Sequence, residues 1–563
     1  MKKAILLVVL SVSAVMFLSN CNGLKKMIQN ADDINYKVTP EVLEMNGGKV
    51  NVSITGNFPE KYFNKNVTAT ITPTLVWEGG EKALTPVYVE GEKIQGNAKV
   101  INYKSGGSFS YNETFEYTQA MRRSKLELRI TGAYKNKTQD FPAEFLADGI
   151  VATPDLVKLE GNGSPAKDKF VKDIPASQSG HVGYDKNKWD LKKDASYDDI
   201  KQYIEKTKDP NNRMELQGVK VTSYTSPEGT EDFNQKIVDS RNKTAKDLVK
   251  KDYKGMNESM FNYLITNQDW EGFKKAVQES NLSDKEMILR VVNMNSDPVK
   301  REQEIRNMTK TFEELEQYIL PLLRKSELVV SIMKIGHTDQ EIQDIYNEDP
   351  SKLTVEELLY LGSKTNDLDK LLNIYTKTTE LYPKEWRGFN NLAVVQYEKR
   401  NYTAAKTAIE KAKSLGANAT VLNNLANVQL QEGNLTEAET NYKAATGVKE
   451  ASAGQGVLAI KKGSYQDAVS FYGSDCVFNA ALAKLLNKNY ETVNSTLDCG
   501  KDKDNAISYY LRAIAGARKS DDNMLFDNLR TAVSKDSSLK NFAAKDVEFL
   551  KYFENETFKG IVK

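Results

Sequence analysis

Apolar and polar residues alternate along the chain from about residue 36 to residue 137. In the run GKVNVSITGNF, for example, Val50, Val52 and Ile54 are separated by polar residues, so one face of a strand would be apolar. Similar short runs follow, separated by turns rich in Gly, Asn and Lys. Several short strands at this spacing predict a β-sandwich, which we place at residues 36–150.

The pattern then changes. Pro154, Pro165 and the glycines between them break any regular element, which predicts a linker at residues 151–169. Strand-like and helical runs alternate through residues 170–336. MELQGVKVTSYT predicts a strand, TEDFNQKIVDSRNKTAKDLVKK predicts a helix with one apolar face, and a longer helical insertion precedes a last strand in RKSELVVSIMK. This order predicts an α/β domain.

From about residue 354 the chain is helical and repeats. Leu392-Ala393 recurs as Leu425-Ala426, and Ala405 recurs as Ala438, a spacing of 33 residues each time. The predicted fold class is therefore multidomain. An N-terminal β-sandwich is followed by a central α/β domain and an all-α solenoid at residues 337–563.

The N-terminus begins Met1-Lys2-Lys3 and continues with an apolar run that ends in Leu18-Ser19-Asn20-Cys21. The run is too short to span a bilayer and is typical of a secretory signal, which we place at residues 1–20. Its end resembles a bacterial lipobox, although Asn20 departs from the usual small residue. The resemblance implies that Cys21 is acylated and inserts into outer-membrane lipid, with residues 21–35 as a lipidated tether. The alternative is an ordinary signal peptide with a chance Cys.

Composition excludes several classes of function. The 78 Lys and Arg residues balance 77 Asp and Glu residues, so no global positive field exists to attract nucleic acid. Only two His residues occur, in different segments, and no Cys lies beside either. A Cys–His nucleophile, a His-based metal site, a P-loop and a dinucleotide fingerprint are not found. The expectation is a protein that is not an enzyme and that uses no metal or cofactor.

The second strand ends in Ser223-Tyr224-Thr225-Ser226, and the turn glycine Gly229, the pair Phe233-Asn234 and Arg241 follow. These residues resemble the OmpA-like domain. The SPEG turn, the helical insertion and the later run ILPLLRKSELVV resemble the branch of that family common in Bacteroidota envelope lipoproteins. The resemblance covers residues 170–336 and implies binding of a peptidoglycan stem peptide. In that family an Asp at the strand end and an Arg on the helix hold the diaminopimelate group.

Arg241 and Asn234 fall where the family has its Arg and Asn, but Ser226 replaces the family's Asp. The ammonium of the ligand therefore loses its formal partner, although Glu228 and Asp232 are near in sequence. We name Ser226, Asn234 and Arg241 as candidate peptidoglycan-binding residues. The alternative is that Asn234 and Arg241 only stabilise the turn.

The helical copies resemble tetratricopeptide repeats, in which small residues let paired helices approach closely. This resemblance implies a protein or peptide partner in the groove of the solenoid, and the alternative is a spacer. A third copy contains Gly456 and Tyr472, and a weaker fourth copy contains Ala481 and Leu497. Cys476 begins the first helix of this fourth copy and Cys499 ends its second helix. Antiparallel helices bring these two positions together, which predicts a disulfide in an oxidising periplasm. Two separate small core residues are the alternative.

The expectation is thus an outer-membrane lipoprotein that touches peptidoglycan and recruits a protein partner. One alternative is an accessory scaffold of an assembly or secretion machine, with the OmpA-like domain reused for protein docking. Another is a surface adhesin accessory that uses the β-sandwich. The residues after Cys21 include Lys25-Lys26 and are basic, whereas Bacteroidota surface lipoproteins tend to be acidic there. We therefore expect the periplasmic face.

Overall fold

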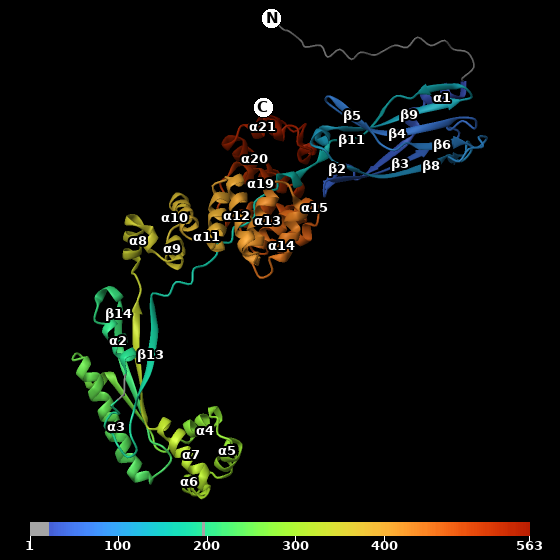
Figure 1. The fold of residues 1–563 in the computed structure, drawn as a ribbon. Coiled ribbons are helices and arrows are strands. Elements are labelled where there is room, and N and C mark those ends of the chain that lie inside the picture. Colours follow the sequence, from blue (N-terminus) through green and yellow to red (C-terminus); the bar gives the residue numbers. More distant parts are fainter. Residues whose placement is uncertain (1–21, 194–196) are drawn as a thin grey trace. The chain divides into compact units, whose positions relative to one another are not determined.

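The computed structural model describes residues 22–193 and 197–563 (Figure 1). The chain forms two compact units. The first unit joins the described residues up to Ala166 with the segment Asp367–Lys563, and the second unit is the segment Lys167–Asn366. The predicted multidomain organisation, with a β-rich N-terminal part and an all-α C-terminal part, is confirmed.

Two β-sheets enclose one apolar core in the N-terminal part of the first unit. Buried and exposed residues alternate in the central strand, where Val50, Val52 and Ile54 are buried. One sheet contains β1 (Asn35–Thr39), β2 (Leu43–Asn46), β3 (Lys49–Phe58), β8 (Gly107–Glu116) and β12 (Ile150–Val151). The other contains β4 (Thr68–Trp77), β5 (Gly80–Ala83), β6 (Val87–Gly91), β7 (Lys99–Ile101), β9 (Lys125–Tyr134), β10 (Lys137–Asp140) and β11 (Glu144–Asp148).

The start of the described chain differs from the expected tether. Asn22–Gln29 form helix α1, and Leu24 and Met27 from this helix are buried in the core of the two sheets. Their spacing of three residues places both side chains on one face of the helix. The chain after Cys21 is therefore packed against the β-sheets.

The C-terminal part of the first unit is a stack of helix pairs. Small residues form the close contacts within it: Ala405 and Ala438 are fully buried, and Gly456 packs against the ring of Tyr472. The helices are α10 (Leu368–Leu381), α11 (Trp386–Glu398), α12 (Tyr402–Leu415), α13 (Ala419–Gln431), α14 (Leu435–Ala444), α15 (Ala451–Lys462), α16 (Tyr465–Tyr472), α17 (Phe478–Leu486), α18 (Val493–Asp498), α19 (Ala506–Lys519), α20 (Asp522–Lys535), α21 (Ser538–Ala543) and α22 (Glu556–Val562).

Buried polar contacts join the β-sheets to the last helices of this stack. The guanidinium of Arg122 lies 3.3 Å from the carboxylate of Asp546, which also accepts a hydrogen bond of 2.7 Å from the hydroxyl of Tyr510. Thr153 donates a hydrogen bond to Glu548, which in turn pairs with Arg518. These contacts explain why both parts belong to one compact unit.

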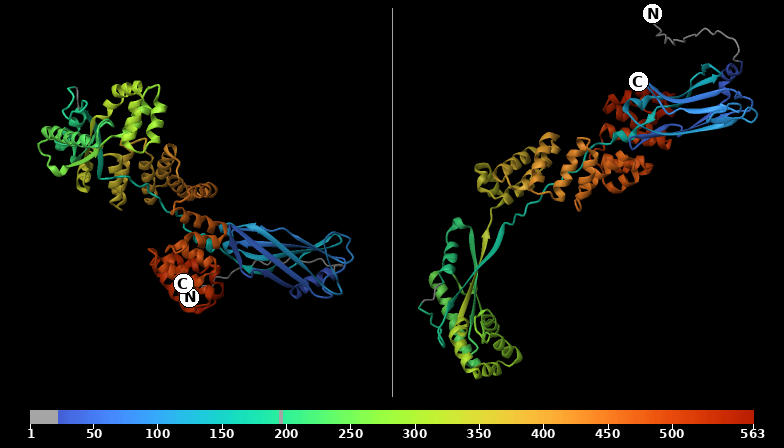
Figure 2. Two further views of the ribbon diagram at one scale, coloured as in Figure 1. Left: turned by 90° about the horizontal axis from the view of Figure 1, so that it is seen from below. Right: turned by 45° about the vertical axis from the view of Figure 1, so that its right-hand side comes forward.

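The second unit is built on a four-stranded sheet in the order β13-β16-β14-β15. Helix α3 packs against this sheet along β14 (Figure 2). The strands are β13 (Asp173–Gly183), β14 (Met214–Tyr224), β15 (Phe261–Thr266) and β16 (Lys325–Ile335). The helices are α2 (Asp198–Lys206), α3 (Glu231–Asp252), α4 (Trp270–Glu279), α5 (Lys285–Met294), α6 (Pro298–Asn307), α7 (Thr309–Tyr318), α8 (Asp339–Glu348) and α9 (Val355–Ser363).

Two features of this unit differ from the expectation. The segment that the sequence predicts as one helical insertion contains a further strand, β15, which pairs in parallel with β14. The unit also extends past residue 336 to Asn366, because α8 and α9 belong to it. An ion pair of 2.9 Å between Arg213 and Glu341 ties α8 to the sheet.

Candidate functional site

The groove of the helical stack contains a segment of the chain itself. Residues 157–166, within the predicted linker, run as an extended chain along α11, α13 and α17 (Figures 1 and 2). They follow β12, which spans the predicted boundary between the β-sandwich and the linker, and the short 3-10 helix Thr153–Leu156, which lies inside the predicted linker. We call residues 157–166 the groove segment.

Asparagine side chains hold the main chain of the groove segment. Three of them each accept a hydrogen bond from a segment N–H and donate one to the carbonyl of the same residue, as a neighbouring strand would. The pairs are Lys158 with Asn479 (2.9 and 2.8 Å), Ser164 with Asn424 (2.8 and 2.7 Å) and Ala166 with Asn391 (2.6 and 3.0 Å). Because these contacts go to the main chain, they do not depend on side-chain identity.

Further amides complete this row. Asn423 and Asn427 both donate to the carbonyl of Asn162, at 3.0 and 2.8 Å, and Asn390 donates to the carbonyl of Ser164 at 3.1 Å. We call Asn390, Asn391, Asn423, Asn424, Asn427 and Asn479 the asparagine row. All six are buried, so leaving one without a partner would cost about 1–3 kcal/mol.

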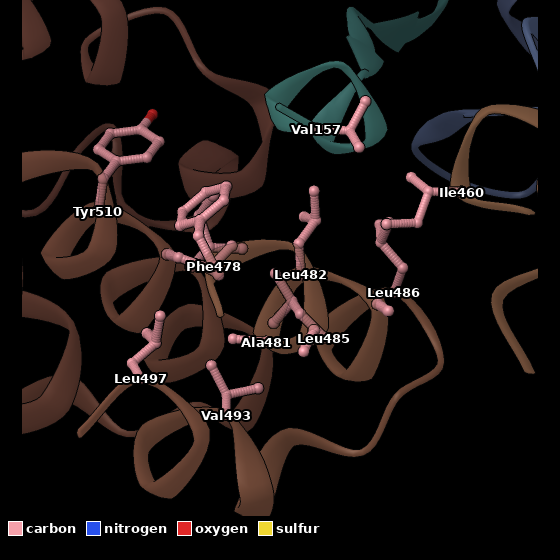
Figure 3. Close-up of a cluster of buried hydrophobic side chains, with 14 of the residues drawn as sticks. Val157, Ile460, Phe478, Ala481, Leu482, Leu485, Leu486, Val493, Leu497 and Tyr510 are labelled. Carbon is pink, nitrogen blue, oxygen red and sulfur yellow. The ribbon is translucent and has the colours of Figure 1, made fainter. Parts of the chain in front are cut away.

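The groove segment carries glycine where the groove wall is closest. A Cβ atom on Gly161 would lie 2.0 Å from Oδ1 of Asn427, and one on Gly163 would lie 2.8 Å from a methyl group of Val394. Val157 is buried among the apolar side chains of the later repeats, beside Leu482 and Ile460 (Figure 3). The segment therefore fits the groove through small residues and through the apolar side chains of Val157, which is buried, and Leu159, which is half-buried.

The asparagine row is a feature that the sequence reasoning missed. The signal is present, because Asn390-Asn391 precede Leu392-Ala393 in one repeat and Asn423-Asn424 precede Leu425-Ala426 in the next. The structure places each pair on the first helix of its repeat, facing the groove segment. Polar pairs at a fixed repeat position therefore mark the inner face of this solenoid.

The three candidate peptidoglycan-binding residues lie together, but they are buried. Ser226, Asn234 and Arg241 have exposed fractions of 5%, 4% and 2%. Asn234 donates to the carbonyls of Glu228 and Gly229, at 3.3 and 3.4 Å, and so closes the turn. Gly229 has a φ of +100°, which a residue with a side chain adopts only with strain.

Arg241 binds the main chain of its own unit. Its guanidinium donates to the carbonyls of Lys188 (3.0 Å), Tyr224 (2.6 Å) and Asp185 (3.4 Å). It also lies over the ring of Tyr184, 4.7 Å from the centroid. Burial lowers the pKa of Arg241 to about 10. In this arrangement the guanidinium joins the end of β14 to the loop after β13.

A buried ion pair lies beside Ser226. The guanidinium of Arg324 is 2.7 Å from the carboxylate of Glu228, and its Nε donates to Oγ of Ser226 at 3.4 Å. Glu228, which could have replaced the family's Asp, is therefore already paired through Oε1, whereas its Oε2 is buried without a hydrogen-bond partner. This pair carries no net charge, and Ser226 lies beside a carboxylate that is already engaged by a guanidinium.

Cys476 and Cys499 lie at the same end of the fourth helix pair. Their sulfur atoms are 2.03 Å apart and their Cα atoms 5.4 Å apart. The Cα distance lies within the range of about 4.4–6.8 Å that a disulfide requires.

We expect the Cys476→Ser/Cys499→Ser variant to unfold with a free energy lower by about 3 kcal/mol, because the bond closes a loop with a sequence separation of 23. Urea denaturation followed by circular dichroism measures this difference. Wild-type protein treated with a reductant serves as the matched sample and should lose a similar amount. Equal midpoints for the oxidised wild type and the variant would contradict the prediction.

The predicted lipidation site, Cys21, lies outside the described residues. Within residues 22–193 and 197–563, no helix is both long enough and apolar enough to cross a membrane. The same residues contain no group of three or more His, Cys, Asp or Glu side chains that could hold a metal ion.

Comparisons with known proteins identify the repeats. Residues 419–452, which include α13 and α14, match the family model for the tetratricopeptide repeat. No curated protein matches the chain. The chain is therefore a multidomain protein with a C-terminal tetratricopeptide-like solenoid.

Several solved structures are similar to the chain at low identity. The APC/C hetero-tetramer Cut9-Hcn1 shares 14% identity at a TM-score of 0.32, over 39% of this chain and 45% of that one. A tetratricopeptide repeat protein from Parabacteroides merdae shares 14% identity at a TM-score of 0.27, over 40% of this chain and 89% of that one. YrrB, described as a TPR protein with an unusual peptide-binding site, shares 18% identity at a TM-score of 0.21, over 36% of this chain and 94% of that one. The chain thus spans less than half of the first of these proteins.

Proposed function

We propose that the protein is a non-enzymatic scaffold of the bacterial cell envelope, anchored to the outer membrane through acylated Cys21 and facing the periplasm. Its solenoid brings protein partners together. The observation that carries this proposal is the asparagine row, because paired amides such as Asn424 and Asn391 bind the main chain of an extended peptide. This chemistry suits a polypeptide partner better than a small molecule or a nucleic acid.

The second unit fits the role of a docking domain in this proposal. Its OmpA-like turn would be reused for protein contact, because Arg241 is already bonded to main-chain carbonyls and Glu228 to Arg324. A stem peptide would have to displace both sets of contacts before it could use these charges. The unit then belongs to an accessory scaffold of an assembly or secretion machine.

Peptidoglycan linkage is the rival function, and the matching positions of Asn234 and Arg241 favour it. Sedimentation of the full chain with purified peptidoglycan separates the two functions. The docking proposal expects the protein to stay in the supernatant. Sedimentation of wild type at micromolar concentration would favour peptidoglycan linkage and would count against the reuse of this unit.

We expect mass spectrometry of the membrane-extracted protein to show a lipid-modified Cys21 at the mature N-terminus. An acyl chain stabilises membrane binding by about 0.8 kcal/mol for each buried CH₂ group. Loss of the lipids should therefore release the protein from the membrane. The Cys21→Ala variant should therefore move to the soluble fraction. An intact Met1, or unchanged membrane partition of the variant, would contradict the expectation.

Crosslinking in intact cells, followed by mass spectrometry, tests the scaffold proposal itself. Exposed lysines on the solenoid, such as Lys411 and Lys443, should crosslink to another envelope protein. Crosslinks only from lysines of the β-sheets, such as Lys61 and Lys135, would favour the adhesin alternative. If all crosslinks are intramolecular, the scaffold proposal is wrong.

A further inference from the structure

We propose that the solenoid groove is a peptide-binding site that the protein keeps closed with its own groove segment. The groove would open to an external extended peptide of the same chemistry, with an apolar anchor like Val157 and small residues like Gly161 and Gly163. This inference rests on the proposed scaffold function, because it assigns the partner a site and a condition for entry.

The bonds of the groove segment are those that a separate peptide would make. Asn391, Asn424 and Asn479 each bind one N–H and one carbonyl of the segment. The partners are far apart in sequence: 225 residues separate Ala166 from Asn391, and 321 separate Lys158 from Asn479. The groove therefore holds the segment as it would hold a ligand, through contacts that any extended chain with small residues can make.

One acceptor of the asparagine row has no hydrogen-bond partner. Oδ1 of Asn423 is buried without a hydrogen-bond partner, although Nδ2 of the same amide donates to the carbonyl of Asn162. The side chain of Asn423 is fully buried. The fit between the asparagine row and the groove segment is therefore incomplete at this oxygen.

Covalent attachment gives the groove segment a large competitive advantage. A tethered segment acts at an effective concentration on the order of 1 mM. A free peptide with the same contacts, supplied at about 10 μM, would then occupy roughly one groove in a hundred. The groove therefore stays closed because the effective concentration of the tethered segment exceeds that of the free peptide, even if both bind the groove with the same affinity.

The test uses the full chain and a fluorescein-labelled synthetic peptide with the sequence of residues 155–168. Wild type should show no change in fluorescence anisotropy at micromolar concentrations. Gly161→Ala/Gly163→Ala should expel the segment, since the new methyl groups would meet Asn427 and Val394, and should bind the peptide about 100-fold more tightly than wild type. Gly560→Ala, where a Cβ meets open space, is the matched control and should behave as wild type.

Two more variants separate the groove segment from the groove. Ser164→Pro removes an N–H that donates to Asn424, so it should also open the groove without adding bulk toward Val394. Adding Asn391→Ala/Asn424→Ala to either opened variant should abolish peptide binding, because the groove then lacks its paired amides. Circular dichroism of each variant checks that the helices remain folded.

Equal peptide binding by wild type and the opened variants would show that the groove segment does not close the site. Absence of binding by both opened, folded variants would show that the groove is not a main-chain peptide site. Either result overturns this inference. Neither depends on finding a partner in the envelope, so failure of the scaffold proposal in the crosslinking experiment remains distinguishable.

Discussion

Replacing Arg241 with alanine is expected to lower the free energy of unfolding of the second unit by about 4 kcal/mol. The substitution removes three hydrogen bonds from a charged donor, to the carbonyls of Lys188, Tyr224 and Asp185, at about 1.5 kcal/mol for each bond. It also removes the contact with the ring of Tyr184. Urea denaturation of the full chain, followed by hydrogen exchange of α3 and β14, measures the loss in this unit.

The matched control for Arg241 is Lys243→Ala, on an exposed position of the same helix. It should change the free energy of unfolding by less than about 0.5 kcal/mol. If Arg241→Ala is as stable as the control, the guanidinium has no structural role and the ligand-binding interpretation of Arg241 becomes stronger.

Replacing Glu228 with alanine is expected to lower the free energy of unfolding of the second unit by about 3–5 kcal/mol, because it leaves the guanidinium of Arg324 buried without its partner. Both side chains of the pair are only 8% exposed, so water compensates little of this loss. The same denaturation experiment measures the effect.

A surface ion pair in the same unit provides the comparison for Glu228. Glu271 lies 2.8 Å from Lys274 and its side chain is 86% exposed. Glu271→Ala should therefore lower the free energy of unfolding by no more than about 1 kcal/mol. Similar losses in the two variants would mean that burial of Glu228 and Arg324 does not control the strength of their interaction.

The periodic patterns of the sequence predicted much of the fold. Alternation at Val50, Val52 and Ile54 gave the correct strand, and the spacing of 33 residues between Ala405 and Ala438 predicted helix pairs that pack through small residues. Such patterns are informative because one face of each element contacts a core within the same domain.

Elements without such a pattern were missed. β15 is short, lies between helices, and exposes Leu264 and Ile265 in succession, so no alternation marks it. The groove segment was predicted as a linker because Gly161, Gly163 and Pro165 exclude a helix or an interior strand. Its hydrogen-bond partners are side chains more than 200 residues away, which local sequence does not indicate.

The polar turn shows a different limit. Sequence position placed Ser226, Asn234 and Arg241 together, as the structure does. The sequence did not show that Arg324, 98 residues after Ser226, pairs with Glu228 and covers the site with a second guanidinium. Exposure of a polar residue depends on such distant neighbours, so matching residues alone do not establish a binding site.

Hydrogen exchange of the groove segment, measured by mass spectrometry on the full chain, tests the central claim most directly. The amides of Lys158, Gly161, Ser164 and Ala166 each donate to a side chain of the solenoid. We predict that they exchange far more slowly than an unstructured peptide, and that Asn391→Ala/Asn424→Ala restores fast exchange. Exchange of the wild-type segment at the rate of an unstructured chain would contradict the claim that the solenoid holds this segment in its groove.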